Sequence, residues 1–126
     1  MLAMAYLGLG SNLGERRRNI AAALELLAQV SERVTCSSAY RSRPQGYDAQ
    51  PWFLNAVCGV LTRLDPFSLL KAARDIQTTM GGRRAFTNGP RRLDIDLLLY
   101  GGSVVSAPGL MVPHPRLAQR EFVLAP

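Results

Sequence analysis

Two aspartates separated by a single residue lie in an apolar stretch near the end of the chain. Asp94 and Asp96 flank Ile95 in the segment LDIDLLLY, whose other residues are Leu, Ile and Tyr. Such a segment is typical of a buried β-strand. Because successive side chains of a strand point to opposite faces, both carboxylates should lie on one face, about 6.5–7 Å apart along the strand. Like charges at this spacing repel each other, so we expect a positive group between them.

This carboxylate pair could bind a hard cation through oxygen. Mg²⁺ takes one or two protein carboxylates and completes its shell with water and substrate phosphate, so a phosphate partner is expected. Arginines that could bind such a phosphate precede the aspartates: Arg83, Arg84, Arg91 and Arg92. The spacing alone does not distinguish this site from the solvent-facing side of an edge strand whose aspartates pair with Arg92.

The composition is that of an ordinary globular domain with excess positive charge. With 126 residues, 48% of them hydrophobic, the chain is long enough to form one core, and we expect a single domain over residues 1–126. Every basic residue except Lys71 is an arginine, and the formal net charge is +6. The planar guanidinium suits bidentate binding of phosphate. A coding bias towards arginine would give the same total, so only the positions of particular arginines are informative.

Neither a membrane span nor a secretion signal is visible. No apolar run reaches the roughly 20 residues of a span, and the N-terminal MLAMAYLGLGSNLG has Gly and Asn where a signal peptide needs its apolar centre. We therefore expect a cytoplasmic protein without membrane contact. Cys36 and Cys58 lie in strand-like segments without a CxxC pattern, which favours buried free thiols over a disulfide or a zinc site.

Hydrophobic periodicity predicts the order of the elements. Strands are predicted at 5–10, 33–42, 53–64, around the two aspartates, near 104 and at 121–125, and helices at 13–30 and 66–80. Asn12 with Glu15 resembles a capping box for the first helix, and Asp65 followed by Pro66 is typical of the start of the second. Residues 110–117 (LMVPHPRL) are predicted to form a proline-rich turn.

The order β, α, β, β, α, β predicts an α+β domain of ferredoxin-like type, in which helices pack against a mainly antiparallel sheet. The longest connections are the loops at 43–52 and 82–92, and long loops in compact domains tend to carry function. Both loops are therefore places to look for a ligand.

Several motifs together resemble the 6-hydroxymethyl-7,8-dihydropterin pyrophosphokinases of folate biosynthesis. They are YLGLGSNLG (6–14), YRSRPQGY (40–47), QPWFLNAV (50–57), GPRRLDIDLLLYG (89–101) and VPHPRLAQREFVLAP (112–126). They cover nearly the whole chain in order. The resemblance implies transfer of the terminal pyrophosphoryl group of ATP to the hydroxymethyl group of a reduced pterin, giving AMP and the pterin diphosphate.

The resemblance also implies a role for particular residues. Asp94 and Asp96 would bind two Mg²⁺ ions and, with Arg84 and Arg91, carry catalysis. Contacts to ATP are implied for Arg83, Arg84, Arg91, His114 and Arg120, and contacts to the pterin for Ser42, Gln45, Phe53, Asn55 and Phe122, with Tyr6 and Gly8 beneath the pterin. Without the resemblance, Asn55 would be an ordinary strand residue, both phenylalanines core and His114 a turn residue.

The chain departs from the usual family pattern at four positions. Gly82 stands where the catalytic loop commonly has an arginine, and Asn88 where many members have a tryptophan. Gln77 and Arg74 replace a frequent glutamate and glutamine on the helix beside the adenine pocket. Family members usually continue beyond residue 126, which leaves open whether the sequence is truncated there or lacks the family's C-terminal extension.

Two alternatives remain open from the sequence. One is a catalytically impaired homologue that still binds pterin or nucleotide, which Gly82 makes worth testing. The other is a small basic RNA-binding module, but Asp94 and Asp96 would place negative charge on the sheet face where RNA phosphates must pass. We therefore expect a monomer whose partners are ATP and a reduced pterin, without nucleic acid.

Overall fold

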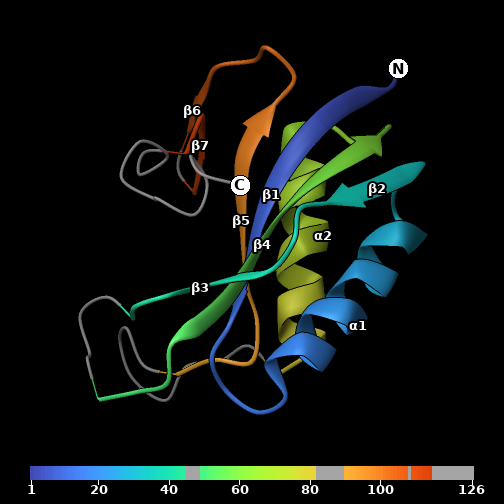
Figure 1. The fold of residues 1–126 in the computed structure, drawn as a ribbon. Helices are drawn as coiled ribbons and strands as arrows, with labels where there is room; N and C mark the ends of the chain where they lie inside the picture. Colours follow the sequence, from blue (N-terminus) through green and yellow to red (C-terminus); the bar gives the residue numbers. More distant parts are fainter. Residues whose placement is uncertain (45–48, 82–89, 108, 115–126) are drawn as a thin grey trace.

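A computed structural model of the chain describes residues 1–44, 49–81, 90–107 and 109–114 (Figure 1). The strands of this part are β1 (Ala3–Ser11), β2 (Arg33–Cys36), β3 (Tyr40–Ser42), β4 (Phe53–Thr62), β5 (Asp94–Tyr100), β6 (Val105–Ala107) and β7 (Leu110–Val112), and its helices are α1 (Arg16–Gln29) and α2 (Pro66–Thr79). Neither of these helices is long and apolar enough to span a membrane.

The main sheet is antiparallel and has the strand order β2-β4-β1-β5, with β3 also paired to β4. Strand β1 pairs with β4 along its whole length, so β2 and β3 share the other edge of β4. With helices α1 and α2 as the crossovers, this arrangement confirms the predicted α+β, ferredoxin-like fold. Strands β6 and β7 form a separate two-stranded sheet.

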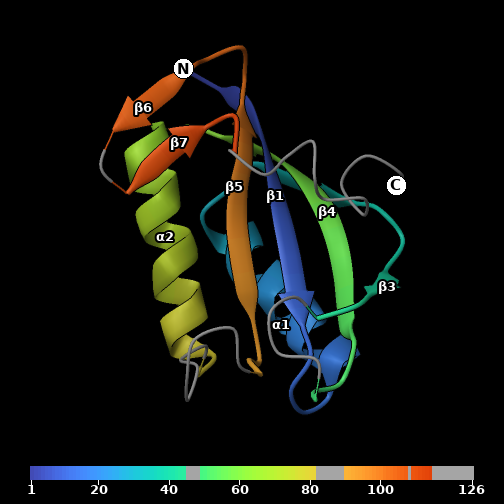
Figure 2. The same cartoon turned by 90° about the vertical axis from the view of Figure 1, so that its left-hand side faces the viewer.

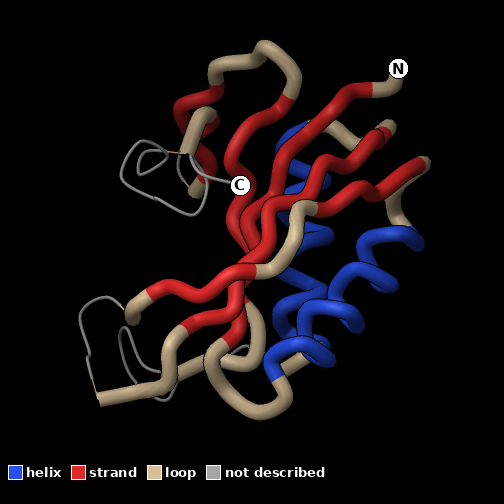
Figure 3. The backbone as a smooth tube through the Cα atoms, viewed as in Figure 1, coloured by secondary structure: helices blue, strands red, loops and turns tan. Residues whose placement is uncertain are grey.

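Strand β1 shows how the alternating pattern builds the core. Ala5, Leu7 and Leu9 are fully buried and belong to one hydrophobic cluster with residues of both helices. Both helices cover this face of the sheet, as Figures 1 and 2 show. The side chains between them in the sequence lie on the opposite face, which carries no helix of the described residues (Figure 3). We call this second surface the open face.

Three of the sequence predictions need correction. Helix α1 begins at Arg16 rather than at 13, and the predicted strand 33–42 is divided into β2 and β3 by residues 37–39. The segment at 110–112, predicted to be part of a turn, is strand β7, which pairs with β6. The strand predicted at 121–125 lies outside the described residues.

The two cysteines form a disulfide, so the prediction of free thiols was wrong. Cys36 on β2 lies directly opposite Cys58 on β4 in the antiparallel register, with the Cα atoms 4.1 Å apart. Directly opposed residues bring their side chains together, and this pairing depends on a register that the spacing of the two cysteines in the sequence does not indicate.

Helix α2 begins with the predicted cap. The carboxylate of Asp65 accepts a hydrogen bond from the backbone N–H of Ser68 at 2.9 Å and one from its hydroxyl at 3.0 Å. Pro66 occupies the first turn, where its missing N–H has no cost. The hydrogen bond from the backbone of Ser68 is the main cause that lowers the pKa of Asp65 below its ordinary value of 3.8.

We expect Asp65→Ala to lower the melting temperature at neutral pH. Because the folded-state pKa is lowered, the ionised cap stabilises the fold above pH 3.8, and this contribution is lost as the pH falls through the folded-state value. Thermal unfolding from pH 7 down to strongly acidic pH measures the effect. Asp75→Ala, which removes an exposed carboxylate paired with Lys71 on the same helix, is the control. A difference between Asp65→Ala and the parent protein that persists undiminished in acid would contradict this assignment.

Candidate active site

Two glycines of β1, Gly8 and Gly10, form a floor without side chains in the middle of the open face. Gly10 lies between Asp94 of β5 and Asn55 of β4, and Gly8 lies between Asp96 and Val57. Two strand spacings separate Asp94 from Asn55, about 9–10 Å. The floor therefore has carboxylates along one side and an amide along the other.

Gly10 leaves little room for a side chain because the neighbouring side chains lean over it. A Cβ atom at this position would lie 3.2 Å from Oδ1 of Asn55 and 3.3 Å from Cδ1 of Phe53. Contacts this short would force both side chains to move. The amide oxygen of Asn55 is thus presented directly above the glycine floor.

The two aspartates lie on one face, as the sequence predicts. Ile95 between them points into the core, whereas the side chains of Asp94 and Asp96 are 17% and 24% exposed. Each has a cationic or titratable neighbour. Nη2 of Arg91 lies 3.2 Å from Oδ2 of Asp94, and Nε2 of His114 lies 3.9 Å from Oδ1 of Asp96. Within the described part of the chain, Arg91 rather than Arg92 lies beside Asp94.

The backbone positions both of these neighbours. The N–H of His114 donates to the carbonyl of Leu98 on β5 at 2.9 Å, so the histidine is held beside the aspartates. The guanidinium of Arg91 lies over the ring of Phe53, 4.4 Å from its centroid. Cation–π attraction stabilises this contact and holds Arg91 between the aromatic ring and Asp94.

Asn55 is 3% exposed, and its neighbours fix the orientation of its amide. Its Nδ2 donates to the hydroxyl of Ser42 at 2.8 Å and to the carbonyl of Tyr40 at 3.2 Å. Strand β3 supplies both partners because Tyr40 and Ser42 pair with β4 at Asn55 and Phe53. Burial raises the pKa of the Tyr40 hydroxyl, an effect opposed by its hydrogen bond with Ser37. Ser42, Phe53 and Asn55, three residues predicted to contact one ligand, are thus brought together.

The family model of 7,8-dihydro-6-hydroxymethylpterin-pyrophosphokinase matches residues 6–126. The chain belongs to this family. The 2-amino-4-hydroxy-6-hydroxymethyldihydropteridine pyrophosphokinases of Methylorubrum extorquens and Bacillus subtilis are 44% and 42% identical to it, over 97% and 98% of this chain and 78% and 75% of their own lengths. The folic acid synthesis protein FOL1 of Dictyostelium discoideum is 40% identical over 98% of this chain, which spans 19% of that protein.

Two of the departures from the family pattern have structural partners in this pyrophosphokinase-family chain. Oε1 of Gln77 accepts a hydrogen bond from the backbone N–H of Ile95, the residue between the two aspartates, at 3.0 Å. Nη2 of Arg74 donates to the carbonyl of Gly109 at 3.3 Å, just before β7. Both side chains of α2 therefore hold the segments that carry the aspartates and His114.

Asn12 is the residue of this site whose role the sequence did not reveal. It was predicted to cap α1, but the N-cap is Glu15, and no side-chain hydrogen bond caps the helix. Asn12 is instead 1% exposed, and its side chain bonds to Gln50, Pro51 and Arg91. One sequence signal could have suggested this role: Asn12 is a polar residue directly after an apolar strand, where a buried position is expected.

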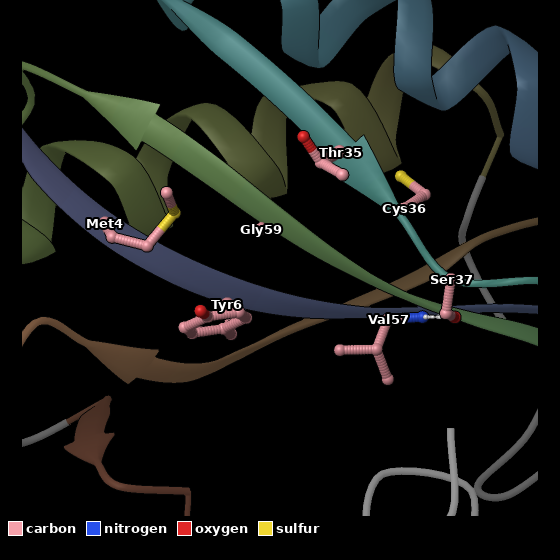
Figure 4. A pocket seen from close by; sticks show the side chains of 7 residues that line it. All are labelled: Met4, Tyr6, Thr35, Cys36, Ser37, Val57 and Gly59. Atoms are coloured by element: carbon pink, nitrogen blue, oxygen red, sulfur yellow. Dashed lines mark hydrogen bonds between the residues drawn. The ribbon is translucent and has the colours of Figure 1, made fainter.

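A further hollow of about 450 Å³ lies on the open face beyond the floor. Figure 4 shows its lining residues, which are Met4, Tyr6, Thr35, Cys36, Ser37, Val57 and Gly59. Tyr6, which was predicted to lie beneath the pterin, packs its ring against Gly59, with Cε1 3.3 Å from where a Cβ of that glycine would be. Of Tyr6 and Gly8, the two β1 residues predicted to lie beneath the pterin, only Gly8 belongs to the floor between the aspartates and β4.

The predicted site residues Gln45, Arg83, Arg84, Arg120 and Phe122 lie outside the described residues, as do Gly82 and Asn88. Within the described part of the chain, no three His, Cys, Asp or Glu side chains form a metal cage. A pair of carboxylates on one face nevertheless fits Mg²⁺, which uses one or two protein carboxylates when substrate phosphates complete its shell.

Proposed function

We propose that this chain transfers the pyrophosphoryl group of ATP to the hydroxymethyl group of 6-hydroxymethyl-7,8-dihydropterin, giving AMP and the pterin diphosphate for folate biosynthesis. Membership of the pyrophosphokinase family supports this activity. The observation that carries the proposal is the glycine floor, with Asp94 and Asp96 along one side and Asn55 along the other. A phosphate-binding half and a ring-binding half then share one face of the sheet.

The pterin would bind on the side of β4. Oδ1 of Asn55 lies over Gly10, where it can accept a hydrogen bond from an N–H group at the edge of the ring. Phe53 offers an aromatic face for stacking, and Phe122 is proposed as the second face. Ser42 holds the amide of Asn55 in orientation, and Gln45 is proposed to line the same pocket.

The triphosphate would bind on the side of β5. Asp94 and Asp96 are the residues that would hold Mg²⁺, and two ions are proposed. When bound, Mg²⁺ neutralises phosphate charge and lowers the pKa of nearby hydroxyl groups. Basic side chains would bind the phosphate oxygens that remain: Arg83, Arg84, Arg91, His114 and Arg120.

In the proposed reaction, the hydroxymethyl oxygen bonds to the β-phosphorus of ATP. The bond from that phosphorus to the α,β-bridging oxygen breaks, and AMP leaves with this oxygen. The hydroxyl proton passes to water, because the described residues near the floor offer no group assigned as a general base. Arg91 lies between Phe53 and Asp94, and from there its guanidinium could move from the carboxylate to bind phosphate oxygens. Positioning and charge neutralisation of this kind supply most of the catalysis in phosphoryl transfer.

We also propose that the protein works as a cytoplasmic monomer without nucleic-acid or membrane partners. ATP is supplied in that compartment, and both proposed half-sites come from one chain, so a second copy is not required to complete them.

The test is the formation of AMP from ATP and the reduced pterin by the purified protein. We expect AMP and pterin diphosphate in equal amounts with Mg²⁺, and neither product after chelation with EDTA. An impaired homologue would bind both ligands in calorimetry yet form no AMP. An RNA-binding module would bind single-stranded RNA with an affinity that falls steeply with salt and is independent of Mg²⁺. Either outcome would contradict the proposed activity.

A further inference from the structure

Asn12 has an unusually complete set of hydrogen bonds for a loop residue. Its Nδ2 donates to Oε1 of Gln50 at 2.7 Å and to the carbonyl of Pro51 at 3.0 Å. Its Oδ1 accepts from the backbone N–H of Arg91 at 2.9 Å, and its own N–H donates to the carbonyl of Arg91 at 3.1 Å. At 1% exposure, these bonds are shielded from water and are therefore well defined in geometry.

These partners belong to the two halves of the proposed site. Pro51 comes two residues before Phe53, where β4 begins and the ring-binding residues follow. Arg91 comes three residues before Asp94, where β5 begins and the carboxylates follow. Strands β4 and β5 do not pair with each other, since β1 lies between them. Asn12, directly after the end of β1, joins the segments that lead into both.

We propose that Asn12 is a positioning residue that sets the distance between the ring-binding half and the phosphate-binding half. This inference rests on the proposed function and deepens it. The side chain of Asn12 bonds to Gln50, Pro51 and Arg91 rather than to the floor, and it acts through these partners. Its loss should therefore disturb the alignment of the hydroxymethyl oxygen with the β-phosphorus more than the binding of either substrate alone.

The chemistry of the side chain explains why an asparagine is required. One end must donate to two oxygen atoms, and the other must accept from an N–H group. Aspartate would keep the acceptor for Arg91 but would place a charged oxygen against Oε1 of Gln50 and the carbonyl of Pro51. Alanine would leave the buried N–H of Arg91 without this acceptor.

The experiment compares turnover with the binding of each ligand in Asn12→Ala and Asn12→Asp. With both substrates saturating, we expect kcat to fall by about tenfold to a hundredfold, the range expected when reacting groups are displaced by about 1 Å or less. Calorimetry should show the dissociation constants of the pterin and of a non-hydrolysable ATP analogue, each measured alone, changed by less than about threefold. Such a split between kcat and binding is not expected from a merely structural residue.

A matched control separates positioning from stability. Thr62 is also buried and polar, lies at the other end of β4, and its hydroxyl accepts from the N–H of Leu64 at 3.0 Å. Thr62→Val should lower the melting temperature while leaving kcat unchanged. If Asn12→Ala does not fold, Gln50→Ala removes one partner of Nδ2 from a partly exposed loop and should still lower kcat with little effect on the two dissociation constants.

The outcomes decide between the conclusions. If the parent protein forms AMP and the folded Asn12 variants keep kcat within about twofold of the parent value, the positioning role is overturned and the proposed function stays intact. Where the Asn12 variants do not fold, the same result in Gln50→Ala has the same consequence. A parallel loss of affinity for both ligands that accounts for the lower activity would also overturn it. Absence of AMP formation by the parent protein would contradict the proposed function, and the inference with it.

Discussion

Asp96→Asn is expected to reduce pyrophosphoryl transfer by about 10³-fold or more while the protein stays folded. Binding of a metal at a transferring phosphoryl group contributes several kcal/mol, and each 1.4 kcal/mol corresponds to a tenfold change in rate. Asparagine keeps the shape of the side chain but removes the charge that would hold Mg²⁺. Nε2 of His114 lies 3.9 Å from Oδ1 of Asp96, longer than a hydrogen bond, so this contact contributes little to stability. Turnover at saturating Mg²⁺ and thermal unfolding measure the two effects.

Asp94→Asn serves as the comparison because its surroundings differ. From the sequence, relief of like-charge repulsion predicts that replacement of either aspartate keeps or raises stability without Mg²⁺. Arg91, mostly buried and 3.2 Å from Asp94, changes this expectation, since the substitution leaves a buried guanidinium without its carboxylate. We expect Asp94→Asn to lower both activity and melting temperature. Asp75→Asn on the exposed side of α2 should change neither, and near-parent turnover in Asp96→Asn would remove the metal site from the proposal.

Asn55→Ala is expected to weaken pterin binding by about 1–3 kcal/mol, which is about fivefold to 150-fold in the dissociation constant, with ATP binding nearly unchanged. The substitution removes the amide oxygen above Gly10 and leaves a polar edge of the bound ring without a partner. Titration calorimetry with the pterin and with a non-hydrolysable ATP analogue, each on its own, measures the two affinities.

Ser42→Ala provides a graded control for Asn55. It removes one of the two acceptors that orient the amide but keeps the amide itself, so the loss of pterin affinity should be smaller. The ATP analogue is the internal reference, because Asn55 lies on the opposite side of the floor from the carboxylates. Equal losses for both ligands in Asn55→Ala would show that the residue supports the fold rather than the pterin site.

The local pattern of the sequence was sufficient to predict most helices and strands and the position of the two carboxylates on one face. Alternation in β1 and β4 and helical periodicity in α2 depend on side-chain direction within one element, which neighbouring residues determine. The same-face position of Asp94 and Asp96 follows from the pleat of a single strand. The cap at Asp65 is equally local, since its partner Ser68 is three residues away.

Contacts between different elements could not be predicted from the local pattern. The disulfide of Cys36 and Cys58 and the pairing of Asp94 with Arg91 rather than Arg92 were not predictable, because they depend on strand register and on where each chain segment enters the sheet. The same is true of Gln77, whose side chain reaches the backbone of Ile95 from a neighbouring helix. Periodicity indicates the face on which a residue lies but not its partner on another element.

Asn12 shows most clearly what each level decided. By itself, the sequence determined the α+β class, the order of the elements, the pair of aspartates on one face and the resemblance to the pyrophosphokinase family. Only the tertiary structure decided that Asn12, instead of capping its own helix, joins Pro51 and Arg91, which lie 39 and 79 residues further along the chain. The physical reason is that a side chain can use its hydrogen bonds locally or across the fold. Strand order brought these distant partners to a buried asparagine, where unsatisfied polar groups would be costly.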